Sequence, residues 1–299
     1  MKLTHIKQTV MAAALAGLVT APATINAQPS AHYVPGIEGL SAASLPPPGV
    51  YLRDYNYFYY ADHYNNASGN KVDGPNPKAF IYAQVPRLIW ITDLELLGGY
   101  IGVDALVPLT YKSLQAGPFN DATFGVGDPF VEATWSKHIK QFDFAGGFGV
   151  WAPTENYNPM NPTWAGSGYW TYMFTAGATW YPDEAKRCTV SVLNRYEING
   201  QQDDTGVTPG QVYTVEGGIG YAITKIITLG ASGYYQQQTT VDTGWGAFGE
   251  QDRVAGIGPE ISTFIPSITL GVSLRYAYEF LAESRLQGNT FTLTVTKRF

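Results

Sequence analysis

The stretch that decides the fold is Thr290-Phe291-Thr292-Leu293-Thr294-Val295-Thr296-Lys297-Arg298-Phe299, the last ten residues of the chain. Small polar and large apolar side chains alternate along it, and a β-strand points successive side chains to opposite faces. The apolar residues can therefore meet lipid while the threonines line a wet interior, as in the closing strand of an outer-membrane β-barrel. An edge strand of a soluble sandwich would alternate in the same way, so the rest of the chain must decide.

The N-terminal residues predict export. Lys2 and Lys7 precede an uncharged run at 10–19, and a stretch of small residues ends at Ala27. This pattern indicates a secretory signal peptide at 1–27, with cleavage after Ala23 as the alternative. Beyond it there is no uninterrupted apolar stretch of the roughly 18 residues that a spanning helix needs. The choice therefore lies between a soluble exported protein and a membrane barrel.

The composition favours the barrel. The chain has 21 Tyr, 7 Trp and 33 Gly but only 14% charged residues, which is typical of an apolar outer face combined with a polar lumen. A single cysteine, Cys188, rules out an intramolecular disulfide framework. The net charge of -6 argues against a nucleic acid partner.

A proline-rich segment precedes the predicted strands. It covers 28–48 and ends in Leu45-Pro46-Pro47-Pro48-Gly49, which cannot pair as a central strand because proline has no amide donor. We expect either a periplasmic leader or a segment inserted into the lumen. The domain organisation is thus 1–27 signal peptide, 28–48 N-terminal segment and 49–299 barrel.

The connections between strand candidates alternate in length. Those after odd-numbered candidates are long and polar, and those after even-numbered ones are short, as expected for long outer loops and short periplasmic turns of a bacterial barrel. The predicted fold is all-β, an up-and-down antiparallel transmembrane barrel of about twelve strands in the bacterial outer membrane. The expected strands are 50–60, 79–91, 98–111, 127–136, 142–152, 169–181, 188–198, 212–223, 226–238, 253–264, 268–281 and 289–299, and the long loops are 62–76, 113–125, 153–168, 199–210 and 239–251.

Aromatic residues mark both ends of the predicted strands. Amphipathic rings collect at membrane interfaces, so those at the short-turn end predict a periplasmic girdle, formed by Trp135, Trp180, Tyr221 and Phe299. A second girdle is expected at the other end, from Tyr57, Tyr59, Tyr111, Trp151, Tyr169, Tyr213 and Tyr235. A soluble sandwich has no reason to carry two such belts.

Charged residues on the inward parity are the candidate permeation residues. An ionised group inside a barrel must be solvated or paired. The mixed signs leave two interpretations open: a salt-bridge network that closes a narrow lumen, or a selectivity lining. The residues are Glu132, Glu216, Glu260, Arg275 and Glu279, with Arg53, Arg87, Arg195 and Glu197 on less regular strands.

A barrel enzyme is the alternative to a channel. Hydrolysis needs a nucleophile with a base in hydrogen-bond reach. After the signal peptide the histidines are His32, His63 and His138, expected in the N-terminal segment, an outer loop and a periplasmic turn. We therefore predict no catalytic residue, no metal site and no cofactor. The Asp203-Asp204 pair could bind calcium, but a solvated loop explains it more simply.

Several short motifs occur along the chain: 32–36 (HYVPG), 45–49 (LPPPG), 88–92 (LIWIT), 125–129 (GVGDP), 151–154 (WAPT), 234–238 (YYQQQ) and 256–259 (GIGP). Together they resemble the family named for the meta pathway of phenol degradation. Their order and spacing carry the resemblance, which covers residues 32–264 or so.

The resemblance implies an outer-membrane transporter encoded beside aromatic-degradation pathways. The expected partners are a small hydrophobic or aromatic solute, outer-membrane lipid and the barrel-assembly machinery. The resemblance transfers no established binding residue. A general porin or a structural barrel without specific transport is the alternative.

Overall fold

The computed structural model describes residues 31–299 except 75, 155–156, 159–160 and 248, so the predicted signal peptide lies outside the described residues. Within them, no helix is both long and apolar enough to cross a membrane. The strands are β1 (Gly49–Asn65), β2 (Lys78–Leu96), β3 (Gly99–Leu106), β4 (Leu109–Ala116), β5 (Phe119–Val126), β6 (Phe130–Ile139), β7 (Phe142–Trp151), β8 (Thr171–Trp180), β9 (Cys188–Asn199), β10 (Val212–Ala222), β11 (Ile227–Gln238), β12 (Arg253–Ile265), β13 (Leu270–Glu283) and β14 (Arg285–Arg298), with a short 3-10 helix at Pro266–Ile268.

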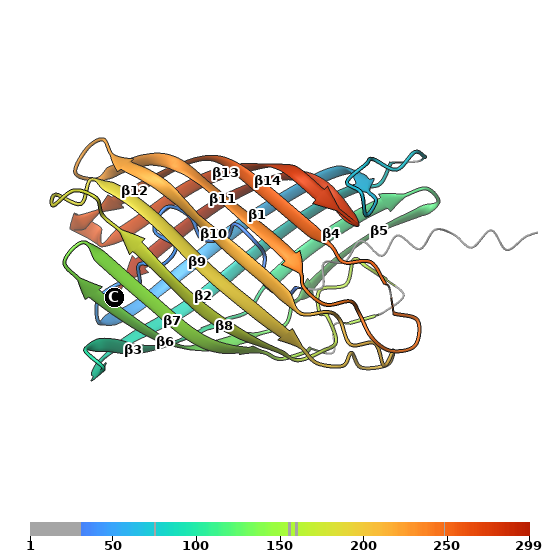
Figure 1. Ribbon diagram of the computed structural model, residues 1–299, viewed down its shortest axis with the longest axis horizontal. Coiled ribbons are helices and arrows are strands. Elements are labelled where there is room, and N and C mark those ends of the chain that lie inside the picture. The colour runs from blue at the N-terminus through green and yellow to red at the C-terminus, as the bar shows by residue number, and fades with distance from the viewer. Residues whose placement is uncertain (1–30, 75, 155–156, 159–160, 248) are drawn as a thin grey trace, which may run out of the picture.

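The strands form a closed antiparallel barrel (Figure 1). β1 pairs with β2 on one side and with β14 on the other, for example Phe58 opposite Phe291, so the sheet has no free edge there. β3 and β4 run in line as one barrel strand, as do β5 and β6, so the fourteen segments of the sheet make twelve barrel strands. The predicted fold is confirmed.

Two barrel strands are interrupted, contrary to the prediction of continuous strands. Val107-Pro108 separates β3 from β4, and Gly127-Asp128-Pro129 separates β5 from β6. The loop expected at 113–125 is wrong, because most of it forms the β4–β5 hairpin. Proline removes a ladder donor without ending the strand direction, so the chain resumes pairing after each break.

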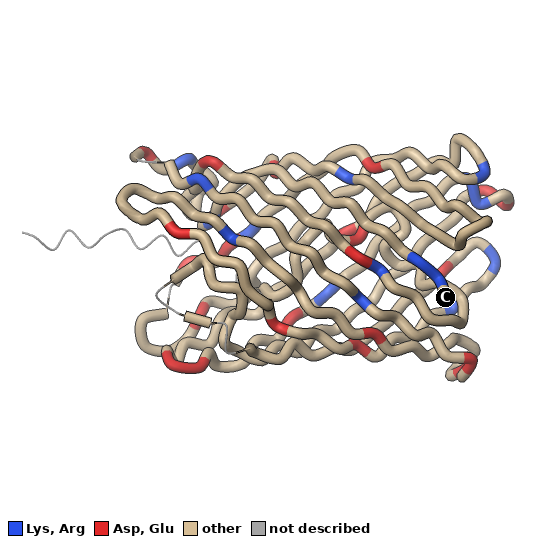
Figure 2. Tube along the Cα trace, turned by 180° about the vertical axis from the view of Figure 1, so that it is seen from behind, with Lys and Arg blue, Asp and Glu red and all other residues tan. Residues whose placement is uncertain are grey.

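The side chains face as the alternation predicts. On β13, Leu274, Tyr276 and Phe280 are exposed on the outside, whereas Arg275 and Glu279 are buried inside. At the short-turn end, Trp180, Tyr221 and Phe299 are exposed and Trp135 is half-buried, consistent with a girdle. Figure 2 shows acidic and basic residues mainly at the two ends of the tube and in a group about halfway along it.

The second predicted girdle is wrong for four of its members. Tyr57, Tyr59, Trp151 and Tyr169 are at most 7% exposed and lie inside the barrel. Their rings share the inward face with residues such as Tyr55, because a strand places every second residue on one side. Amphipathic rings suit a lumen wall as well as a membrane interface. Their position near the strand ends was therefore not enough to assign these four residues to a girdle.

We expect Phe299→Ser to impair assembly. The Phe299 amide donates to the Val50 carbonyl at 3.0 Å, which continues the β14–β1 pairing, and its ring is 75% exposed at the short-turn end. We predict that this ring completes the girdle and is recognised by the barrel-insertion machinery. The measurement is the amount of heat-modifiable barrel in the outer membrane, with Val72→Ser in an outer loop as the control. Wild-type levels of the Phe299→Ser barrel would contradict this role.

Candidate solute pocket and lumen plug

Residues 31–48, called the plug from here on, lie inside the barrel. Wall carboxylates take the place of the ladder partners that this irregular backbone lacks. Glu197 Oε1 accepts the amides of His32 and Tyr33, each at 3.0 Å. Glu216 Oε2 accepts those of Gly36 and Glu38 at 3.0 and 3.2 Å. The plug is thus held by its backbone.

Further contacts extend along the plug toward the short-turn end. Glu260 accepts the Leu40 amide at 3.1 Å, and Ser191 accepts that of Ala43 at 3.1 Å. Arg275 Nη1 donates to the carbonyls of Gly36, at 3.1 Å, and Ile37. The chain therefore runs lengthwise through the lumen.

Glu38 of the plug lies at the centre of an ionic network. Arg53 and Arg87 approach its carboxylate at 3.2 and 3.5 Å, and the Tyr55 hydroxyl donates to it at 2.6 Å. Arg87 also donates to both oxygens of Asp104 at 2.8 Å and to Glu132 at 2.9 Å. Buried charges of both signs thus neutralise one another across the lumen.

All nine charged residues predicted for the lumen lie inside the barrel. Arg53, Arg87 and Glu132 belong to the Glu38 network. Arg195 lies 3.8 Å from Glu216, and Arg275 lies 3.1 Å from Glu260. Glu279 joins neither Arg275 nor Glu260, and instead accepts hydrogen bonds from the Tyr59 and Tyr234 hydroxyls and the Gly288 amide. The complete set is Arg53, Arg87, Glu132, Arg195, Glu197, Glu216, Glu260, Arg275 and Glu279.

Glu38 and Asp104 were not among the predicted lumen residues. Glu38 is the single acidic residue of 28–48, and a lone charge in an apolar coil could have drawn attention to it. Asp104 has the same strand parity as Gly102 and Leu106, so the alternation along β3 indicates that it faces the lumen.

His32 fixes the outer end of the plug. Its Nε2 lies 2.9 Å from Asp128, its Nδ1 lies 2.9 Å from the Thr171 hydroxyl, and its ring stacks on Trp151. The order hydroxyl, imidazole, carboxylate matches that of a hydrolytic triad. Thr171 is fully buried, however, and its hydroxyl donates to Asn199 at 2.6 Å, so this arrangement positions the plug.

The other histidines lie at strand ends, which corrects their expected places. His63 is in β1 beside Asp62, and His138 is in β6 beside Asp143. Among the described residues, no group of three or more His, Cys, Asp or Glu side chains is arranged to hold a metal ion.

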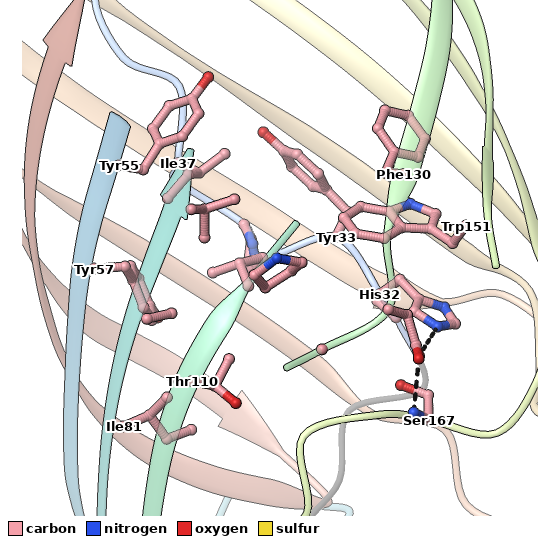
Figure 3. A pocket seen from close by; sticks show the side chains of 18 of the residues that line it. His32, Tyr33, Ile37, Tyr55, Tyr57, Ile81, Thr110, Phe130, Trp151 and Ser167 are labelled. Carbon is pink, nitrogen blue, oxygen red and sulfur yellow. Dashed lines mark hydrogen bonds and ion pairs between the residues drawn. The ribbon is translucent and has the colours of Figure 1, made fainter. Parts of the chain in front are cut away.

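A cavity of about 260 Å³ lies on the long-loop side of the plug (Figure 3). The plug forms its floor through His32, Tyr33 and Ile37, and the barrel wall surrounds it. The apolar part of the wall includes Tyr55, Tyr57, Tyr59, Ile81, Ala83, Val85, Leu106, Phe130, Trp151 and Met173. A small apolar solute fits such a lining.

Comparisons with solved structures show the fold. An outer membrane channel from Pseudomonas putida F1 superposes with a TM-score of 0.78 at 16% identity, covering 89% of this chain and all of that one. The β-domain of the Bordetella autotransporter BrkA gives 0.52 at 10% identity, with 85% and 100% coverage. The translocator domain of the autotransporter NalP from Neisseria meningitidis gives 0.51 at 11% identity, with 86% and 91% coverage.

No curated protein sequence matches the chain. A family model described as "Putative MetA-pathway of phenol degradation" matches residues 61–295, which is most of the chain. The match includes all of β2 to β13 and leaves out the plug. The chain therefore belongs to this family, as its motifs predicted.

Proposed function

We propose that the protein is an outer-membrane channel for the passive uptake of small hydrophobic or aromatic compounds. The observation that carries this proposal is the ring-lined cavity of about 260 Å³ on the long-loop side of the plug. A solute arriving from outside reaches this cavity before it reaches the ionic network. Membership of a family named for phenol degradation supports an aromatic solute.

The plug argues against a general porin. A porin lumen is a water-filled path, whereas the plug and its ion pairs occupy this lumen at the level of Glu38, Arg87 and Arg275. Passage past this level requires the plug to move. A selective route for small solutes agrees with this arrangement better than bulk diffusion does.

Filling the cavity should abolish uptake. Ala83 is 7% exposed and lines the cavity, so Ala83→Trp places an indole where the solute binds. We expect cells with this variant to take up radiolabelled phenol or toluene as slowly as cells without the gene. Ala133→Trp, on the lipid-facing side of β6, is the matched control and should keep wild-type uptake. Equal uptake with and without the gene would refute the proposal.

A further inference from the structure

Lys112 differs from the other cations that line the cavity. Arg87, Arg195 and Arg285 each face a carboxylate within 4 Å. Within the part of the chain that the structure describes, Lys112 has no such partner, and its ammonium group donates to the Trp164 carbonyl at 2.9 Å. An ammonium group has three donors, so two remain available toward the cavity.

The acidic residue near Lys112 is already occupied. Asp128 accepts the Thr154 amide and hydroxyl on one oxygen, and the Ser167 amide and His32 ring on the other. A carboxylate offers about four acceptor sites, and these four contacts fill them. Asp128 therefore forms no ion pair with Lys112 within 4 Å, and its oxygens are held by these four contacts.

Two more polar groups on the cavity wall lack a partner. Thr110 Oγ1 and Trp151 Nε1 are buried and make no hydrogen bond among the described residues, although both residues are more than nine-tenths buried. Figure 3 shows both side chains among those around the cavity. Thr110 lies two residues from Lys112 on β4, so the two side chains share a face.

These groups are all hydrogen-bond donors, and the same cavity has a large apolar wall. Buried donors are normally paired, and a pure hydrocarbon would leave Thr110, Trp151 and the two remaining donors of Lys112 without a partner. An oxyanion attached to an apolar body accepts from Lys112 and from Thr110, which share a face of β4, and it also neutralises the Lys112 ammonium group. The complementary ligand is therefore an amphipathic organic anion.

We propose that the cavity selects small organic acids with an apolar ring, such as aromatic carboxylates, and that Lys112 binds the carboxylate with Thr110 beside it. This inference rests on the proposed function and specifies its solute. It predicts that, among ring compounds of similar size, the cavity binds an anion more tightly than a neutral compound or a cation.

Calorimetric titration of the folded full-length barrel in detergent tests the inference with benzoate, benzyl alcohol and benzylamine. We expect benzoate to bind about tenfold more tightly than benzyl alcohol. A tenfold ratio corresponds to about 1.4 kcal/mol, which is close to the contribution of one hydrogen bond to a charged group. Benzylamine should bind more weakly than either. Lys112→Met should remove the preference for benzoate and keep the affinity for benzyl alcohol. Lys112→Arg should retain the preference.

Lys137→Met is the matched control, because Lys137 also donates to a backbone carbonyl, that of Leu97, but at the short-turn end. It should behave as wild type. Benzyl alcohol binding as tightly as benzoate to the wild type, or a Lys112→Met barrel that keeps the preference, would overturn the inference and leave the proposed function standing. If no ring compound binds, both fail. Heat-modifiability verifies that each variant is folded.

Discussion

Leu274→Arg is expected to lower the free energy of unfolding by about 2–4 kcal/mol, the usual cost of an arginine on the lipid face of a barrel. Leu274 is 38% exposed on the outside of β13, between Ile261 of β12 and Leu293 of β14. All three side chains are aliphatic, so a guanidinium there has no acceptor within the wall. The measurement is a denaturant titration of the barrel in lipid vesicles.

Two controls separate charge from the loss of leucine. Leu274→Met keeps an apolar side chain of similar volume and should cost less than about 1.5 kcal/mol. Ser262→Arg adds the same charge on the inward face of β12, two residues from Glu260, and should cost much less than Leu274→Arg. Equal destabilisation by the two arginine variants would refute the assigned facing.

The facing of the strands could be predicted because it depends on a local period of two. On β13 the sequence from Leu270 to Phe280 alternates without a break, and the structure keeps that register against β14. The alternation of loop lengths likewise follows from the up-and-down topology. Neither feature needs information from distant parts of the chain.

The interrupted strands show the limit of that approach. Pro108 and Pro129 lie between strand segments, and most of the residues between them were predicted to form an outer loop. Parity cannot recognise the β4–β5 hairpin, since β5 alternates small, polar and apolar residues less regularly than β13 does. The pairing of β2 continues in one register from β3 to β4 across Pro108, whereas the pairing of β3 and β4 with β6 and β5 shifts by one residue at Gly127-Asp128-Pro129, so a strict period of two fails at this break.

The plug could not be predicted from local patterns. Several of its anchors join distant residues, as His32 to Glu197, 165 positions apart, and Ala43 to Ser191, 148 positions apart. A coil without periodicity gives no indication of whether it lies inside or outside the barrel. Parity did place the wall charges in the lumen, but several of their partners belong to the plug, namely its backbone amides and carbonyls and the Glu38 carboxylate, and the period of a strand does not reveal them.

Deleting residues 32–45 is expected to raise the single-channel conductance several-fold in planar bilayers. The pairing of β1 with β2 and β14 closes the barrel, and the plug contributes no strand to it. The shortened protein should therefore still fold and remain heat-modifiable. The deletion removes the chain segment that occupies the lumen, including Glu38. Ser41→Ala, at an exposed plug position, keeps the plug contacts described above and should conduct as the wild type does.

The same deletion should make the pore prefer cations. Without the plug, Glu197, Glu216 and Glu260 lose the amides they accept, and Arg275 keeps only Glu260 as an ionic partner. The wall carboxylates in this part of the lumen then outnumber the guanidinium groups: Asp104, Glu132, Glu197, Glu216, Glu260 and Glu279 against Arg53, Arg87, Arg195 and Arg275.

Rings of carboxylates favour cations in a narrow aqueous pore, so the reversal potential in a salt gradient should shift toward that of the cation. Arg275→Ala in the intact chain removes one plug anchor. It should give brief openings with the same preference for cations as the deletion variant. A folded deletion variant with wild-type conductance would show that the plug does not block the path. A conducting but anion-selective variant would instead contradict the placement of the carboxylates along it.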